Sequence, residues 1–342
     1  MVKILADTDV CPAPPEGSVV TIGAYDGVHL GHQAVIAEVR RRAQEAGQRS
    51  AVVTFDRHPA HVIRPDSAPL LLTDLEQKLE LLAQTGIDYA LVVRFDKERA
   101  SESAEDFVES VLQRCLNARQ IVVGEDFHFG FQRRGNVGLL NEMGQTLGFS
   151  VLGHKLVGLD GQAARDDAQV SSTAIRRALH EGRLVDANLM LGRSHEMRGT
   201  VVLGDQRGRS LGFPTANVAI SDEMLMPADG IYAGWIERQR NVSAPASSGL
   251  GMAALPAAIY VGKRPTFYDD QAMTLLEVHV LDFAGDLYGE QVSVRFDHRL
   301  RADAKFASVA ELTEQLQLDC EKARGLLGSP TLGGPTLGGL TR

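Results

Sequence analysis

The first half of the chain alternates short apolar runs with longer segments whose apolar positions recur at helical spacing. Strands are predicted over residues 18–25, 50–55, 87–95, 119–127 and 150–157. Helices are predicted over residues 31–47, 72–86, 103–116 and 137–148. Short apolar strands separated by helices are typical of a parallel, doubly wound sheet, whose ligands collect beyond the carboxyl ends of the strands. We therefore expect an α/β domain in this half.

The pattern changes after the segment SSTAIRRALHEGRLVDANLMLG. From Arg198 onward, short strands with turn residues between them are predicted over residues 198–204, 230–237, 257–262, 275–283 and 290–296. This spacing is typical of a small antiparallel barrel or sandwich. A helix follows over residues 308–327, where Ser308 and Glu311 are placed to form a capping box, and we expect it to close the barrel.

The change of pattern predicts two domains with a boundary between residues 183 and 197, and 342 residues are also long for a single core. We assign residues 1–185 to the first domain and residues 186–327 to the second. Residues 328–342 repeat PTLGG and are predicted to be a disordered tail. Residues 238–254 are predicted to be a flexible surface loop of the second domain.

Composition limits the possible partners. The net charge of -9 argues against nucleic acid, which needs a basic face, so an anionic ligand must be held by local arginines and backbone N–H groups. No apolar run is long enough for a signal peptide or a membrane span, so we expect a cytoplasmic protein with no membrane partner. Cys11, Cys115 and Cys320 are odd in number and far apart, which predicts a reducing compartment and neither a disulfide framework nor a zinc knuckle.

The stretch TIGAYDGVHLGHQAV carries the clearest candidate chemistry. Gly23, Gly27 and Gly31 recur at every fourth position, which is not a GxGxxG fingerprint, and the lysine of a Walker loop is missing. The strand runs through this turn into a helix, so N–H groups at the helix N-terminus can face a phosphate. His29 and His32 fall at that N-terminus about one turn apart, where both imidazoles can point at the same anion.

Three interpretations of this turn compete. Two histidines at a helix cap are most often only polar capping residues. A metal site would need a third ligand, for which Asp26 or His58 is available, but the spacing matches no zinc signature. The phosphate hypothesis explains the glycines as well as the histidines, and we adopt it.

The turn GAYDGVHLGH resembles the G-x-F-D-G-V-H-x-G-H turn of the bacterial bifunctional riboflavin kinase/FAD synthetase family, a branch of the nucleotidyltransferases. VVTFDRHP, LLLTDLEQKLELL, VVGEDFHFGFQRRGN and SSTAIRRAL follow in the family's order. The resemblance implies a Rossmann-like nucleotidyltransferase domain that transfers the adenylyl group of ATP to FMN, giving FAD and pyrophosphate. It also implies Mg²⁺ as the cofactor and no covalent enzyme intermediate.

The resemblance assigns roles to residues of the first domain. His29 and His32 are implied to be catalytic, and Phe127 is implied to contact the flavin. The residues implied to bind ATP or its phosphates are Gly23, Asp26, Gly27, Gly31, Asp126, Ser172, Thr173 and Arg176. Taken alone, an aspartate that follows a strand is more often a turn residue, and serines before a helix are ordinary caps.

A second candidate site lies in GDQRGRSLGFPTANV. Pro214 fixes the chain before Thr215 and Asn217, which alternate on one face of an extended segment and offer two hard oxygens to Mg²⁺. Together with the preceding glycine loop, PTAN resembles the signature of riboflavin kinases and implies ATP binding by Gly208, Arg209, Gly212, Thr215 and Asn217.

The same resemblance extends to the strands and loops that follow. In TLLEVHVLDF, Glu277 is implied to be the general base that takes the proton from the ribityl 5′-hydroxyl of riboflavin as it attacks the γ-phosphorus of ATP. Arg299 and Arg301, in HRLRADAKF, are implied to bind the flavin.

The implied ligands are riboflavin, FMN, FAD and ATP or ADP, and the sequence leaves a homo-oligomer open. Two alternative functions also remain. One is a metal-dependent phosphodiesterase using His29, His32 and His58, and the other is a non-catalytic flavin-binding protein. Intact His29, His32 and Glu277 count against the second alternative, because binding alone needs none of their chemistry.

Overall fold

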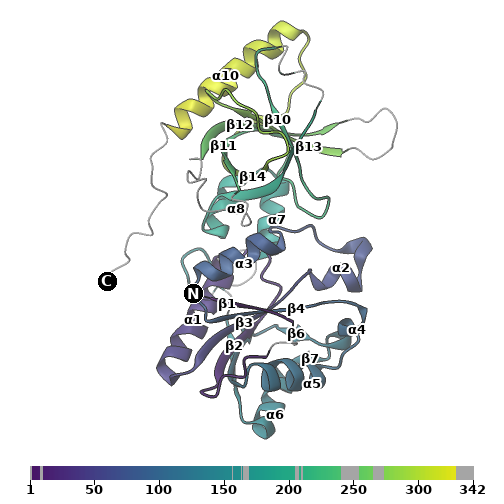
Figure 1. The fold of residues 1–342 in the computed structure, drawn as a ribbon, viewed down its shortest axis with the longest axis vertical. Coiled ribbons are helices and arrows are strands. Elements are labelled where there is room, and N and C mark those ends of the chain that lie inside the picture. The colour runs from purple at the N-terminus through teal and green to yellow at the C-terminus, as the bar shows by residue number, and fades with distance from the viewer. Residues whose placement is uncertain are drawn as a thin grey trace. The chain divides into compact units, whose positions relative to one another are not determined.

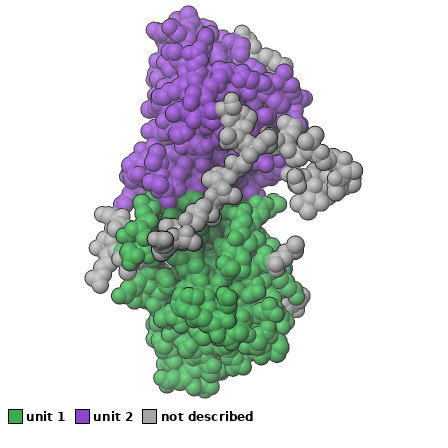
Figure 2. All heavy atoms as spheres, turned by 90° about the vertical axis from the view of Figure 1, so that its left-hand side faces the viewer, with its two compact units in different colours: residues 1–175, 190–192 green, residues 176–189, 193–342 purple. Residues whose placement is uncertain are grey.

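The structure is a computed structural model that describes residues 2–7, 11–155, 157–162, 164, 169–204, 208, 211–239, 254–264 and 273–328. The chain forms two compact units (Figure 2): unit 1 comprises residues 1–175 and 190–192, and unit 2 comprises residues 176–189 and 193–342. The division falls within helices α7 (Ser172–His180) and α8 (Leu184–Leu191). Most of the predicted loop at 238–254 and of the predicted tail lies outside the described residues.

Unit 1 is built on a six-stranded parallel sheet in the order β1-β4-β3-β2-β5-β8. Strands β1 to β4 of this sheet are labelled in Figure 1. Its strands are β1 (Lys3–Ala6), β2 (Ser18–Ile22), β3 (Arg49–Phe55), β4 (Tyr89–Val93), β5 (Ala118–Gly124) and β8 (Ser150–His154). The chain winds outward from β2 on one side and from β5 on the other, so the strand order reverses between these two strands. The prediction of a doubly wound sheet is confirmed, and a ligand site is expected at the reversal.

Helices cover both faces of this sheet, because neighbouring positions along each strand enter two different apolar clusters. Val19 of β2 packs with α1 (Leu30–Ala46) and α3 (Leu75–Gln84). Val20 packs on the opposite face, against the helices of the second half of the unit. These are α5 (Ala104–Phe107), the π-helix η2 (Val108–Cys115) and α6 (Val137–Leu147).

Shorter elements complete the edge of unit 1 at which the strands end. They are α2 (Pro59–Ile63), the 3-10 turns η1 (Pro65–Ser67) and η3 (Phe131–Arg133), α4 (Lys97–Ala100), and the two-stranded hairpin of β6 (His128–Phe129) and β7 (Gly135–Asn136). Strand β1 and this hairpin were not predicted from the sequence. Both are short and owe their conformation to pairing with another strand.

The structure corrects the prediction made for the cysteines. Cys11 and Cys115 form a disulfide across 104 positions of sequence, so the prediction of no disulfide is wrong for this pair. The segment before β2 crosses the end of η2, where the backbone N–H of Ala13 donates to the carbonyl of Cys115 at 2.9 Å. This crossing brings the two side chains together, and a distance in sequence does not reveal it. Cys320 is a buried free thiol.

Unit 2 is a closed antiparallel barrel in the order β10-β13-β12-β11-β14-β9, which decides between the predicted barrel and sandwich. Its strands are β9 (His195–Val202), β10 (Ala216–Ala219), β11 (Gly230–Arg238), β12 (Leu255–Arg264), β13 (Met273–Val280) and β14 (Gln291–Ala302). The final helix, α10 (Val309–Leu327), begins at the predicted cap, where Ser308 Oγ accepts from the N–H of Glu311 at 3.2 Å. Cys320 and Ala323 of this helix pack on the barrel. No helix within the described ranges is both long and apolar enough to cross a membrane.

Candidate functional site

The glycine turn joins β2 to α1 at the point where the strand order reverses. Tyr25, Gly27 and Val28 have φ angles of 51°, 83° and 36°, so the backbone is left-handed at three of four consecutive positions. Such angles are uncommon outside glycine and are held by the surrounding structure. For Tyr25, the buried ring supplies this support, because its hydroxyl lies 2.7 Å from the Thr21 Oγ1. The result is a tight turn that delivers His29 to the start of α1.

Asp26 holds this turn in place through hydrogen bonds. Its carboxylate is only 4% exposed and accepts hydrogen bonds from the backbone N–H groups of Leu72, at 3.0 and 3.1 Å, and Thr73, at 3.1 Å. The N–H of Gly27 donates in turn to the Thr73 Oγ1 at 3.1 Å. These contacts tie the turn to the segment before α3, and they favour a shaping role for Asp26.

The two histidines form one unit. His29 is the N-cap of α1, and its Nδ1 accepts from the N–H of His32 at 3.3 Å. In the neutral imidazole the proton therefore resides on the Nε2 of His29, which makes that atom a donor. The rings of His29 and His32 stack with centroids 3.6 Å apart. The structure thus brings together the two side chains that the sequence singled out.

The segment before α7 also lies against the turn. An added Cβ at Gly31 would lie 2.9 Å from the carbonyl oxygen of Val170, so this position has no room for a side chain. The Ser172 Oγ donates to the backbone carbonyl of Asp26 at 2.9 Å. The predicted serine segment and the glycine turn are therefore neighbours within unit 1. Thr173 is exposed, and Arg176 lies one helical turn later, in the part of α7 that belongs to unit 2.

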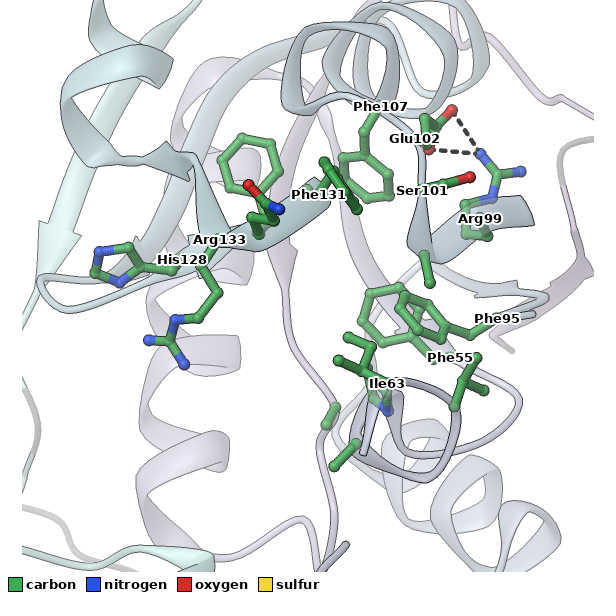
Figure 3. A pocket seen from close by; sticks show the side chains of 18 of the residues that line it. Phe55, Ile63, Phe95, Arg99, Ser101, Glu102, Phe107, His128, Phe131 and Arg133 are labelled. Atoms are coloured by element: carbon green, nitrogen blue, oxygen red, sulfur yellow. Dashed lines mark hydrogen bonds and ion pairs between the residues drawn. The ribbon is translucent and has the colours of Figure 1, made fainter. Parts of the chain in front are cut away.

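A cavity of about 830 Å³ opens beside the turn, and Gly23 and Ala24 belong to its lining. Figure 3 shows this cavity from close by. Six phenylalanines line it: Phe55, Phe95, Phe107, Phe127, Phe129 and Phe131. The Phe127 and Phe129 rings stack with centroids 5.4 Å apart, and Arg99 forms an ion pair with Glu102 at 2.9 Å on one wall. Stacked aromatic walls with a few polar groups suit a flat, conjugated ring.

The sequence identified only one of these aromatic residues, Phe127. The other five lie in separate segments at or after the ends of β3, β4 and β5. In the sequence, each looks like an ordinary apolar residue. Their position along the chain could have identified two of them. Phe55 ends β3 and Phe95 follows β4, and ligands bind where parallel strands end. Asp126 is exposed and does not line the cavity. Its carbonyl oxygen lies 2.7 Å from the His128 Nδ1.

In unit 2, the second candidate site lies on the outer face of two paired strands. Leu276 and Val278 are buried, whereas Glu277 and His279 alternate with them on the other face. The Thr215 Oγ1 lies 3.3 Å from the Glu277 Oε2, and Asn217 pairs directly with Glu277 across β10 and β13. The three predicted residues therefore form one cluster of oxygens.

Neighbouring residues set the chemistry of this cluster. Tyr260 pairs with Glu277 from the other side, and burial raises the pKa of its phenol to about 12, so it stays protonated near neutral pH. Glu277 is thus the group beside Thr215 that can accept a proton. Gly204 and Gly208 pack closely here, since a side chain at Gly204 would collide with the amide of Asn217 and one at Gly208 with the carbonyl of Phe213.

A second cavity, of about 480 Å³, borders this cluster. Its lining includes Pro214, Thr215 and Val278, together with residues 283 and 285–288 of the loop after β13. Thr215 therefore belongs both to the oxygen cluster and to the wall of the cavity. Gly212 has a φ of 86° and opens the turn that leads to Pro214, and Arg209 lies outside the described residues.

The two predicted flavin arginines are engaged with protein groups. Arg301 forms a bidentate pair with Asp319 of α10, with Nε–Oδ2 and Nη2–Oδ2 distances of 3.0 and 2.7 Å. Asp319 is only 4% exposed, so this pair anchors the terminal helix to β14. The Arg299 Nη2 donates to the carbonyl of Asp229 at 3.1 Å, and its guanidinium packs over Gly182.

The fold and the candidate sites together define the class of protein to which each unit belongs. Unit 1 has the strand reversal, glycine turn and helix N-terminus of a nucleotide-binding α/β transferase, and unit 2 adds a carboxylate beside two neutral oxygens on a barrel. These features place unit 1 in the class of nucleotide-binding α/β proteins and unit 2 among small closed β-barrels.

Comparisons with known proteins identify the family. Residues 11–174 match the FAD synthetase family, and residues 191–327 match the riboflavin kinase family. The bifunctional riboflavin kinase/FMN adenylyltransferase of Escherichia coli K12 is 37% identical over 316 residues, which cover 92% of this chain and 95% of that protein. The Bacillus subtilis protein of the same name is 34% identical over 308 residues, covering 90% and 91%.

A solved structure from Streptococcus pneumoniae, described as a macrolide-efflux protein, superimposes with a TM-score of 0.78 and 30% sequence identity. It covers 94% of this chain and 98% of its own. The chain belongs to the family of bifunctional riboflavin kinases/FMN adenylyltransferases.

Proposed function

We propose that this chain phosphorylates riboflavin to FMN in unit 2 and transfers the adenylyl group of ATP to FMN in unit 1. One observation carries the assignment within unit 1: the aromatic cavity ends at Gly23 and Ala24, where the histidine turn begins. An isoalloxazine ring between the phenylalanines would direct its phosphate tail along the wall toward His29.

The adenylyl transfer needs position and charge stabilisation. A phosphate oxygen of FMN attacks the α-phosphorus of ATP in line, the bond from that phosphorus to the bridging oxygen breaks, and pyrophosphate leaves. The Nε2 of His29 and the stacked imidazole of His32 donate to the phosphate oxygens as negative charge develops. Ser172, at the start of α7, donates to the carbonyl of Asp26, and Thr173 beside it is proposed to help hold the leaving pyrophosphate.

The riboflavin kinase reaction needs a base. The Glu277 carboxylate takes the proton of the ribityl hydroxyl as the hydroxyl oxygen attacks the γ-phosphorus of the second ATP, and ADP leaves. Thr215 marks the junction between Glu277 and the second cavity, so the nucleoside occupies the cavity and the phosphates point toward the glycine loop.

The donor set of this cluster fits Mg²⁺. Hydroxyl, amide and carboxylate oxygens are hard ligands, and Mg²⁺ usually takes few protein ligands in addition to substrate phosphates and water. Thr215 and Asn217 are the residues proposed to hold it. When bound, the ion would neutralise charge on the transferred phosphoryl group.

The phosphodiesterase alternative has less support. His29 and His58 both use Nδ1 to cap helices, with His58 accepting from the N–H of Ala60 at 3.2 Å. Within the described ranges, no three His, Cys, Asp or Glu side chains gather as a metal site. The flavin-binding alternative predicts binding without turnover, which an assay separates directly.

The test is a time course with riboflavin, ATP and Mg²⁺, in which FMN and FAD are separated by chromatography. We expect FMN to appear first and FAD to follow with release of one pyrophosphate. Hydrolysis of FAD in the absence of ATP would support the phosphodiesterase. Stoichiometric flavin binding by folded protein, with no product over hours, would support the binding protein.

A further inference from the structure

A buried lysine lies behind the glycine turn and was not singled out by the sequence. Lys78 is on the second turn of α3, and the residue is only 7% exposed. Its Nζ donates to the carbonyl oxygen of Phe55 at 2.7 Å and lies 3.4 Å from the carbonyl oxygen of Ala24. Phe55 ends β3, and Ala24 follows β2, so one ammonium group joins the ends of two neighbouring strands.

These two carbonyl groups belong to the wall of the site. Phe55 and Ala24 both line the aromatic cavity, and Ala24 is part of the turn that presents His29. The negative ends of two carbonyl dipoles converge at this point, and Thr54 Oγ1 also donates to the Ala24 oxygen at 3.2 Å. Without a cation beneath them, these oxygens would repel a polyphosphate that approaches the turn.

Among the described residues, the Lys78 ammonium group forms no direct ion pair. Among the described contacts of Lys78, both hydrogen-bond acceptors are backbone carbonyls. The charged groups that face it are Asp26, on the turn, and Asp56, which follows β3. Asp26 is bonded to the N–H groups of Leu72 and Thr73. Asp56 accepts from the N–H of Phe95 at 2.8 Å. Burial lowers the pKa of Lys78 to about 8, and both carboxylates oppose this shift.

We propose that Lys78 is a positioning residue for adenylyl transfer. Its ammonium group holds the carbonyl groups of Ala24 and Phe55 in place and supplies a fixed positive charge behind the turn, without touching substrate. The role rests on the proposed FMN adenylyltransferase activity of unit 1. A buried charge is costly to maintain, and a purely architectural link between two strands would not require one.

The test compares Lys78→Arg, Lys78→Gln and Lys78→Met with wild-type protein and with Lys3→Met, which removes an exposed lysine of the same unit. FMN-to-FAD conversion is measured by steady-state kinetics. Riboflavin phosphorylation by unit 2 controls for the amount of active protein, and denaturant unfolding of unit 1 controls for its fold. We expect Gln and Met to lower kcat of FAD synthesis roughly 100-fold, with KM for FMN changed less than threefold. Arg should retain most of kcat, and Lys3→Met should match wild type.

The pH profile separates charge from architecture. In wild type, kcat should fall as pH rises through about 8, because the lysine loses its proton there. In Lys78→Arg this limb should move to higher pH, since guanidinium stays protonated. Equal kcat in the Gln variant and wild type would overturn the proposal, as would an unchanged limb in an active Arg variant. Wild-type protein that makes no FAD would instead refute the proposed function.

Discussion

The two units build their sites in different ways. In unit 1, the proposed reactive side chains lie on a turn and at helix N-termini, at the edge of a parallel sheet. A buried network of Asp26, Thr73 and Lys78 holds that turn. In unit 2, Asn217 and Glu277 sit within paired antiparallel strands, so the strand register itself places them.

This difference predicts how each site tolerates change. A site on a loop depends on supports from distant parts of the chain, so substitutions behind it should lower activity without removing any group that touches substrate. A site on paired strands is held in place by the hydrogen bonds between the strands. Its activity should therefore depend mainly on the reactive groups themselves. The following variants test this contrast, from the largest expected effect to the smallest.

Glu277→Gln keeps the shape of the side chain and removes the base. We expect riboflavin phosphorylation to fall roughly 1,000-fold, within the range for loss of a general base, because the ribityl hydroxyl has no proton acceptor. FMN-to-FAD conversion by the same preparation should be unchanged. Normal kinase turnover in this variant would rule out Glu277 as the base.

His29→Ala removes one donor and the N-cap of α1. We expect FAD synthesis from FMN to fall on the order of 100- to 1,000-fold, because a phosphate donor is lost where charge develops. Riboflavin phosphorylation should be retained, and it serves as the control for an intact unit 2. His29→Asn restores a capping side chain, so recovery of full activity in that variant would show that capping alone matters.

Cys11→Ser tests the disulfide of unit 1. Without reductant, we expect the free energy of unfolding of unit 1 to fall by about 2–4 kcal/mol, because the cross-link closes a long loop. In excess dithiothreitol, variant and wild type should unfold at the same denaturant concentration. Three titratable thiols in unfolded, non-reduced wild-type protein would show that the disulfide does not form.

Arg301→Met breaks the pair that ties α10 to the barrel. Asp319 would be left buried without a cation and with only the hydrogen bond from Gln315, so we expect unit 2 to lose about 2 kcal/mol of stability in denaturant unfolding. Because the guanidinium is occupied by Asp319, KM for riboflavin should change little. A tenfold rise in KM with unchanged stability would instead support the flavin contact that the family resemblance implies.

The sequence placed several residues of both candidate sites, for reasons that differ between the units. In unit 1, glycine spacing between a strand and a helix is local, so the positions of His29 and His32 followed from it. In unit 2, alternation along one strand placed Glu277 and His279 on a shared face. The contact of Thr215 with Glu277 joins residues 62 positions apart and needed the barrel's register.

The amino-acid sequence by itself determined most of the larger elements, the two kinds of sheet and the candidate reactive groups. Hydrophobic period, glycine spacing and capping patterns act within one or two turns of chain, so they can be read locally. Only the tertiary structure decided that six phenylalanines from separate segments share one cavity, that Cys11 meets Cys115, and that Lys78 lies under the ends of two strands. Each of these depends on how strands stack side by side, and no local pattern encodes that arrangement.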